Sequence, residues 1–232
     1  MRSQMICAFF LSLILVGCGK TELPTTLSGQ VKELGSEGLE DVTFCLAGSD
    51  VLCTQTDTGG LYILEGPAAE TDLSFTLTKD GYLGGALSVT TSLEPIEVPV
   101  VSMAGEVVME LQMGILSVDA IEDTGQVAFS ISNGINGDGV NVPNIQTTLE
   151  PASGDGPFYS NDSGLPAPEL TQTSANGGGV YVNVEPGTYS LTHLNIPDNC
   201  SLMLGWGSAR SPSFEVFANR VTYVRIECLS QD

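Results

Sequence analysis

Apolar and polar residues alternate with a period of two along much of the chain. Leu73, Phe75 and Leu77 alternate with Asp, Ser and Thr residues, and the stretch 189–193 repeats the pattern. This alternation predicts half-buried β-strands. Turn-forming clusters at short intervals separate the predicted strands, which is typical of an all-β sandwich. Further β-rich runs lie at 42–46, 61–64, 86–90, 96–101, 107–113, 115–118, 127–131, 145–149, 180–184, 214–217 and 221–226.

The chain contains an internal repeat. Asp41–Leu46 resembles Asn144–Leu149 at an offset of 103 residues, and Asp57–Ile63 resembles Asn176–Val182 at an offset of 119. The two blocks occur in the same order in both copies. The additional residues of the second copy fall in 151–168, a stretch rich in Pro, Gly, Ser and Asp, which indicates a surface loop.

Two copies predict two tandem β-sandwich domains of the Greek-key type. We place the first at 26–113 and the second at 114–232, and both lengths are within the range of independent domains. In each copy Asp57 or Asn176 is expected to cap a turn whose glycines take positive φ. The tyrosines that follow these turns, Tyr62 and Tyr181, are expected to point into the sandwich.

Four segments of the first copy form an ordered pattern. They are Gly29-Gln30-Val31, Gly38-Leu39-Glu40-Asp41-Val42, Thr56-Asp57-Thr58-Gly59-Gly60-Leu61-Tyr62 and Lys79-Asp80-Gly81-Tyr82. Over residues 26–103 this pattern resembles the carboxypeptidase regulatory-like domain, a transthyretin-like β-sandwich. The second copy retains Asn176–Tyr181 and Glu185–Tyr189 of the pattern but lacks an evident opening glycine. The resemblance implies an accessory module without catalytic residues, and no HxxE motif of the associated zinc peptidase lies upstream.

Composition restricts the function classes. Hydrophobic residues make up 42% of the 232 residues and charged residues 15%, so the chain has enough apolar surface for a packed core. The 27 glycines and 12 prolines favour short strands and turns over long helices. Twenty-eight acids against seven bases give a formal charge of -21, which argues against nucleic acid as a partner.

The first residues form a predicted secretion signal. Arg2 precedes an apolar stretch, Met5–Val16, that is shorter than the roughly 20 residues of a membrane-spanning helix. Leu15-Val16-Gly17-Cys18 resembles the lipobox of bacterial lipoproteins, which implies cleavage after residue 17 and acylation of Cys18. The alternative is an ordinary signal peptide with a chance cysteine.

The lipobox sets the expected location. Residues 18–25 would form a short lipidated tether that holds the acidic body near a membrane, because an acidic body cannot bind anionic lipid by charge. Gly19 after the cysteine, rather than Asp, implies transfer to the outer membrane in the enterobacterial pattern. The sequence therefore predicts a lipid-anchored envelope protein.

Cys7 lies in the leader and Cys18 is the expected acylation site, which leaves four of the six cysteines. In an oxidising compartment we expect two disulfides, Cys45 with Cys53 across a turn and Cys200 with Cys228, because nearest-neighbour pairing keeps each bridge within one domain. Free buried thiols are the alternative. A zinc site is disfavoured, since no CxxC spacing occurs.

Few residues are candidates for chemistry. His193, the only histidine, has no recognisable nucleophile or orienting partner and is expected to be structural. Asn133, Asn136 and Asp138 place oxygen atoms on a Gly-rich loop as Ca²⁺ prefers, although a plain turn is the alternative. Trp206 would stack on a sugar if exposed, but a core position is favoured. A solvated acidic face is expected at Asp119, Glu122, Asp123, Asp155 and Asp162.

These observations predict a non-catalytic cell-envelope lipoprotein with a structural, adhesive or scaffolding role and no cofactor. Its expected partners are a membrane, through acyl chains, and envelope proteins or surface glycan. Exposed sheet edges and the loops 134–143 and 151–168 are the expected contact surfaces. The alternative is a module that binds glycan or a divalent cation.

Overall fold

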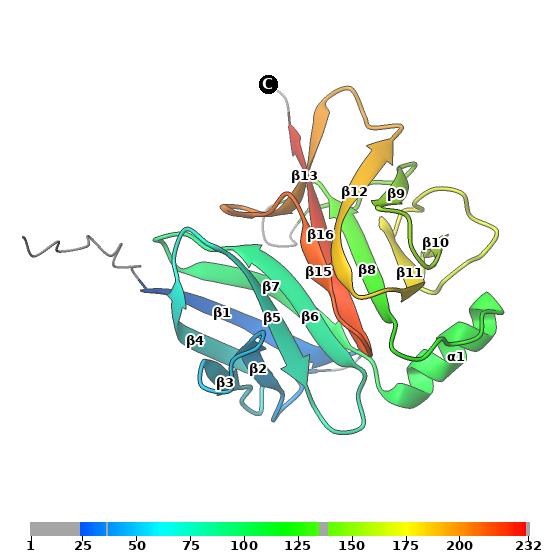
Figure 1. Cartoon of the computed structure of the whole chain (residues 1–232). Helices are drawn as coiled ribbons and strands as arrows, with labels where there is room; N and C mark the ends of the chain where they lie inside the picture. Colours follow the sequence, from blue (N-terminus) through cyan, green and yellow to red (C-terminus); the bar gives the residue numbers. More distant parts are fainter. Residues whose placement is uncertain (1–23, 36, 135–138, 231–232) are drawn as a thin grey trace, which may run out of the picture.

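The computed structural model describes residues 24–35, 37–134 and 139–230, and they are mostly β-strand (Figure 1). The all-β prediction is therefore confirmed. The expected signal peptide and Cys18 lie outside the described residues. No helix in the described part of the chain has the length and apolar character needed to cross a membrane.

The first half of the chain is a sandwich of two sheets. One sheet has the order β4-β1-β7, and the other runs β3-β2-β5-β6. Phe44 stacks on Tyr62 and on Phe75 between them, with ring centroids 4.4 and 5.2 Å apart. The strands are β1 Pro24–Glu33, β2 Thr43–Leu46, β3 Cys53–Gln55, β4 Leu61–Ala68, β5 Asp72–Thr78, β6 Gly84–Thr90 and β7 Ile96–Met103.

The second half is a sandwich of the same kind. Its sheets have the orders β10-β11-β8-β16 and β9-β12-β15, and Phe129, Tyr181 and Ile226 are in the core between them. The strands are β8 Gly125–Ser132, β9 Gln146–Glu150, β10 Asp155–Tyr159, β11 Gly178–Val184, β12 Gly187–Leu194, β13 Cys200–Trp206, β14 Ala209–Arg210, β15 Phe214–Val216 and β16 Arg220–Ser230.

Six strands of the first half correspond to six strands of the second. The sheet β4-β1-β7 corresponds to β11-β8-β16, and β2-β5-β6 corresponds to β9-β12-β15. Strand directions also match, because β1 pairs in parallel with β7 as β8 does with β16, and the other corresponding pairs are antiparallel.

A buried threonine marks the same place in each half. Thr56 Oγ1 accepts the N–H of Val42 at 2.9 Å and donates to the carbonyl of Leu39 at 2.6 Å. Thr173 makes the same two hydrogen bonds, both at 2.9 Å, with backbone groups 103 residues further along the chain. The threonine hydroxyl thus satisfies buried backbone groups where the chain enters β2 and β9.

These hydrogen bonds correct the register of the second repeated block. Thr56 corresponds to Thr173, and Gly60 at φ 73° corresponds to Gly177 at φ 70°, so the offset is 117 rather than 119. A shift of two residues preserves strand alternation, which explains how the sequence comparison missed it. Tyr62 and Tyr181 are both buried, as expected.

The corrected register also changes the expected turn cap. Asp57 Oδ1 accepts the N–H groups of Gly59 and Leu61 at 2.9 Å, as predicted. In the second half Ser174, not Asn176, occupies the corresponding position, and Ser174 Oγ accepts the Asn176 N–H at 3.1 Å.

Residues 106–116 correct another expectation, because they form helix α1, Glu106–Leu116, where the sequence predicts strands at 107–113 and 115–118. Met, Leu, Glu and Gln residues, which are not branched at Cβ, favour a helix, and Glu106 suits its N-terminus. Ser117 ends the helix in the left-handed conformation, with its N–H directed at the Gly114 carbonyl. The proposed domain boundary at residue 114 thus falls inside α1.

The C-terminal strand β16 joins the halves. It pairs in parallel with β8 over Val221–Glu227 and with β6 over Arg220–Thr222, and β13 pairs with it antiparallel from residue 200 to residue 204. One ten-stranded sheet therefore runs through both sandwiches, with β16 between them (Figure 1).

Candidate functional site

The junction between the sandwiches is built on the two faces of β16. Val224 and Ile226 belong to the core of the second half. Tyr223, Arg225 and Glu227 alternate with them and point to the other face, where Tyr223 packs against the core of the first half. The polar residues of the strand thus lie at the junction.

Three side chains bridge the junction through backbone carbonyls of the first half. Tyr223 donates its hydroxyl hydrogen to Ser102 at 2.9 Å, and Trp206 donates its indole N–H to Glu97 at 2.8 Å. Arg220 donates to Leu77 at 3.1 Å. Two of the three carbonyls belong to β7, so this strand is tied to the second half near both of its ends.

A buried carboxylate supports the β13–β14 hairpin at the same junction. Glu227 is 1% exposed, and its Oε2 accepts the N–H of Gly207 at 3.1 Å and lies 3.4 Å from Arg210 Nη2. Its other oxygen, Oε1, has no hydrogen-bond partner among the described residues. This pairing holds the hairpin against β16.

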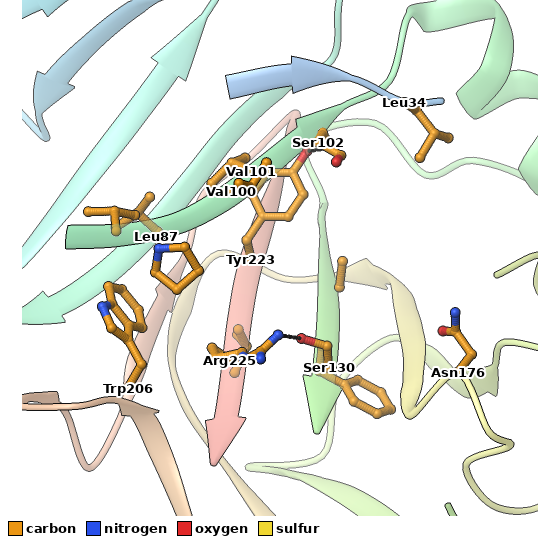
Figure 2. Close-up of a pocket in the computed structure, with 15 residues that line it drawn as sticks. Leu34, Leu87, Val100, Val101, Ser102, Ser130, Asn176, Trp206, Tyr223 and Arg225 are labelled. Carbon is orange, nitrogen blue, oxygen red and sulfur yellow. Dashed lines mark hydrogen bonds between the residues drawn. The ribbon is translucent and has the colours of Figure 1, made fainter. Parts of the chain in front are cut away.

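A cleft of about 400 Å³ opens beside these contacts (Figure 2). Strand β7 forms one wall over residues 98–102, and Tyr223 and Trp206 close parts of it. Arg225 and Asn176 are the cation and the amide among the residues that line it. The cleft thus combines apolar walls with a single guanidinium group.

Arg225 is incompletely paired in this cleft. Its Nη1 donates to Ser130 Oγ at 3.4 Å, its Nη2 contacts Ser132 Oγ, and its Nε is buried without a hydrogen-bond partner in the described chain. Burial lowers the pKa of Arg225, and the charge of Glu227 acts in the opposite direction. Two serine hydroxyls are the hydrogen-bond partners of this cation.

The sequence interpretation missed Arg225, although a signal was present. The three arginines of the described chain, Arg210, Arg220 and Arg225, all fall in the last segment and all lie at the junction. In an acidic chain with seven bases, this clustering of guanidinium groups is informative. The strand pattern alone does not show which face meets the first half.

Trp206 lies in the core, the position that the sequence favours over a sugar platform. It is 5% exposed and belongs to the core of the first half, although it lies on β13 of the second. Stacking on a sugar needs an open ring face, which this indole does not offer.

The two disulfides have the predicted pairing. Cys45 and Cys53 face each other directly across β2 and β3. Cys200 and Cys228 join β13 to β16, with Cα atoms 5.2 Å apart. The second bridge therefore secures the strand that holds the two halves together.

The structure describes one of the three predicted oxygen ligands. Asn133 is exposed, while Asn136 and Asp138 lie outside the part of the chain that the structure describes. Among described residues no group of three or more His, Cys, Asp or Glu side chains could hold a metal ion.

The expected acidic face is divided. Asn183 donates to the Asp119 carbonyl at 2.9 Å and to Asp155 Oδ2 at 2.8 Å, so these two acidic residues lie at one site. Asp162 instead accepts the N–H of Ala175 at 3.1 Å in the loop before β11. Asp155 and Asp162 therefore have local structural contacts.

His193 lies in β12 opposite Thr147 of β9. Burial lowers its pKa to about 4, and its Nδ1 has no hydrogen-bond partner among the described residues. A histidine in this state is neutral at neutral pH.

A second cavity of about 610 Å³ lies beneath α1, lined in part by Met109, Met113 and Arg220. The opposite side of the helix is apolar but exposed. We call this surface the α1 stripe; its residues are Val107, Val108, Leu111 and Ile115.

No protein-family model and no curated protein matches the chain. Solved structures with some likeness include GBS52, the minor pilin of Streptococcus agalactiae, at 12% identity and a TM-score of 0.33, over 90% of this chain and 97% of that one. A streptococcal ancillary pilin has 14% identity and a TM-score of 0.29, over 92% and 64%.

A type II cohesin–X-dockerin complex from Acetivibrio cellulolyticus has 18% identity and a TM-score of 0.30, over 34% of this chain and 56% of that one. This chain thus spans less than two thirds of the cohesin–dockerin chain and of the ancillary pilin. At these TM-scores the likenesses carry no argument, and the fold is defined by the strands themselves.

Proposed function

We propose that this protein is a non-catalytic cell-envelope lipoprotein, held by acyl chains on Cys18, that serves as a structural, adhesive or scaffolding module. In this proposal 26–113 and 114–232 are two carboxypeptidase regulatory-like sandwiches, and the anchoring membrane is the outer membrane. The observation that carries the proposal is the sharing of β16, which joins both sandwiches in one continuous sheet.

The position of the N-terminus supports the anchoring. Strand β1 begins at Pro24, and the five residues between it and Cys18 span about 20 Å when extended, so the body would stay close to the membrane. Glu33 at the far end of β1 pairs with Met103, shortly before α1. The α1 stripe therefore lies about one strand length, roughly 30 Å, from the anchored end, where envelope proteins can reach it.

Lipidation is tested with two cysteine variants of the full chain. We expect Cys18→Ser to lose incorporation of labelled palmitate and to shift from the membrane fraction to the soluble fraction, or to remain uncleaved. Cys7→Ser, a matched change within the leader, should behave like the wild type. Unchanged palmitate labelling and unchanged membrane retention of Cys18→Ser would refute the proposed anchor.

The interaction role is tested separately, in intact cells, with a photo-cross-linker at Leu111 on the α1 stripe. The control places the same group at Val51, which is 93% exposed in the first half. We expect defined adducts with one or a few envelope proteins from position 111 only. Equal, diffuse adducts from both positions would contradict an interaction role for this surface.

A further inference from the structure

Strand β7 presents an open edge to the junction cleft. It is the last strand of the sheet β4-β1-β7, and residues 98–102 line the cleft (Figure 2). Trp206 and Tyr223 donate hydrogen bonds to the carbonyls of Glu97 and Ser102, and the segment 98–101 lies between these two contacts. Among the described residues no side chain or loop hydrogen-bonds to the backbone of 98–101. Pro99 in this segment lacks an N–H to donate, and the remaining backbone groups of an exposed edge can pair with another extended chain.

Arg225 supplies a charged group near that edge. Two of its five N–H groups contact the hydroxyls of Ser130 and Ser132, and its Nε has no hydrogen-bond partner among the described residues. Glu227, the nearest acid along the strand, is paired with Arg210 instead. A planar guanidinium with free donors is the side chain best suited to bind a carboxylate in a fork geometry.

The size and walls of the cleft restrict the ligand. Its volume of about 400 Å³ is within the range of small-ligand sites, which is roughly 300 to 1,000 Å³. Leu34 and Val100 at its walls are 58% and 53% exposed, so apolar side chains of the protein are left in contact with solvent there. A ligand that covers them gains from apolar burial.

The net charge of the whole molecule further limits the kind of ligand that can bind in the cleft. A formal charge of -21 repels a free anion, whereas it attracts a chain that carries basic groups beside its carboxylate. We propose that the junction cleft binds the C-terminal end of a basic, extended polypeptide, with the peptide paired to β7 and its terminal carboxylate on Arg225. This inference goes beyond the proposed function and does not require Cys18, so either can fail without the other.

The test uses the full chain and the synthetic peptide acetyl-Lys-Thr-Val-Lys-Val in isothermal titration calorimetry. We expect the peptide with a free carboxylate to bind at least ten-fold more tightly than the same peptide with a C-terminal amide. Equal affinity of the two forms would overturn the proposal. So would equally tight binding of decanoate or of inorganic phosphate, because these would indicate an acyl-chain cleft or a simple anion site.

Variants test whether Arg225 binds the terminal carboxylate of the peptide. Arg225→Gln should remove the preference for the free carboxylate, whereas Lys79→Gln, which deletes the same charge elsewhere, should keep it. If Arg225→Gln fails to fold, Leu34→Asp at the exposed cleft wall is used instead. This variant should bind the free-carboxylate peptide at least five-fold more weakly than the wild type. A free-carboxylate preference retained by Arg225→Gln would overturn the assignment of Arg225, and full affinity retained by Leu34→Asp would overturn the placement of the peptide in this cleft.

Discussion

At the scale of single residues, the two halves keep some buried polar contacts and have lost others. The threonine contacts of Thr56 and Thr173 are the same in both halves. The buried tyrosines, which lie two positions apart in the corrected register, differ. Tyr181 donates its hydroxyl hydrogen to the Thr147 carbonyl at 3.0 Å, whereas the Tyr62 hydroxyl has no partner among the described residues. Similar sequence motifs therefore carry different energetic roles.

This difference predicts opposite outcomes for one substitution. Tyr181→Phe should lower the free energy of unfolding by about 1 to 3 kcal/mol, because it leaves a buried carbonyl unpaired. Tyr62→Phe removes an already unpaired hydroxyl and should change stability by less than about 0.5 kcal/mol, or increase it. Urea denaturation of both variants beside the wild type measures the difference. Equal losses of unfolding free energy in the two variants would contradict the absence of a hydrogen-bond partner for the Tyr62 hydroxyl.

His193 predicts a pH dependence. Burial lowers its pKa from 6.5 to about 4, so below pH 6.5 the unfolded chain binds a proton that the folded chain does not. The associated stability is complete above pH 6.5 and is lost as the pH falls through 4. From about pH 7 to about pH 4.5 we expect the wild type to lose on the order of 1 to 2 kcal/mol more than His193→Gln, allowing for solvent screening.

Two measurements check this dependence. Urea denaturation of the wild type and His193→Gln at both pH values gives the difference directly, and the variant controls for the carboxylates that titrate in the same range. Because the chain has one histidine, its ring proton signals in NMR report its titration alone. A titration midpoint near 6.5 would contradict the burial of this ring.

At the scale of elements, α1 is attached to the body mainly through its C-terminal end. Leu116 is 5% exposed and packs with Val180 and Val182 of β11. The α1 stripe lies on the exposed side, with Leu111 64% exposed. A helix with this distribution gains little folding energy from its exposed side chains.

Substitutions on α1 should reflect this asymmetry. Leu116→Ala should lower the free energy of unfolding by about 2 to 4 kcal/mol, since it leaves a cavity against β11. Leu111→Gln, on the exposed side of the same helix, should change it by less than about 0.5 kcal/mol. Chemical denaturation compares the two, and a large loss for Leu111→Gln would mean that the stripe is covered in the folded protein.

At the scale of the whole molecule, β16 belongs to both sandwiches, and Trp206 of the second half is part of the first core. Opening either half therefore exposes buried surface of the other. Independent domains joined by a linker would lack this coupling.

We therefore expect the two halves to unfold in a single transition. Trp206 fluorescence and far-ultraviolet circular dichroism should give coincident urea curves with the disulfides intact. Tyr223→Phe, which removes the bond to Ser102, should shift both curves together. Two separated transitions, or a shift in only one of the two signals, would contradict coupling through the junction.

Properties that depend on neighbours along the chain could be predicted from the sequence alone. Period-two alternation gave most strands and the inward direction of Tyr62 and Tyr181, because each strand residue faces one side or the other. Short spacing gave the Cys45–Cys53 bridge. The same local signals were insufficient at residues 106–116, where Val, Leu and Met are compatible with strand or helix, and in β13, which has a weaker alternation.

Which strands lie beside one another follows from long-range packing and could not be predicted from local patterns. Nothing in the pattern of 220–230 shows that β16 pairs with β6 as well as β8, because pairing depends on surfaces that folding brings together from distant positions. The same long-range packing buried Trp206 in the opposite half and placed Arg225 at the cleft. Local periodicity specifies the faces of each strand, and the burial of those faces against distant partners specifies the site.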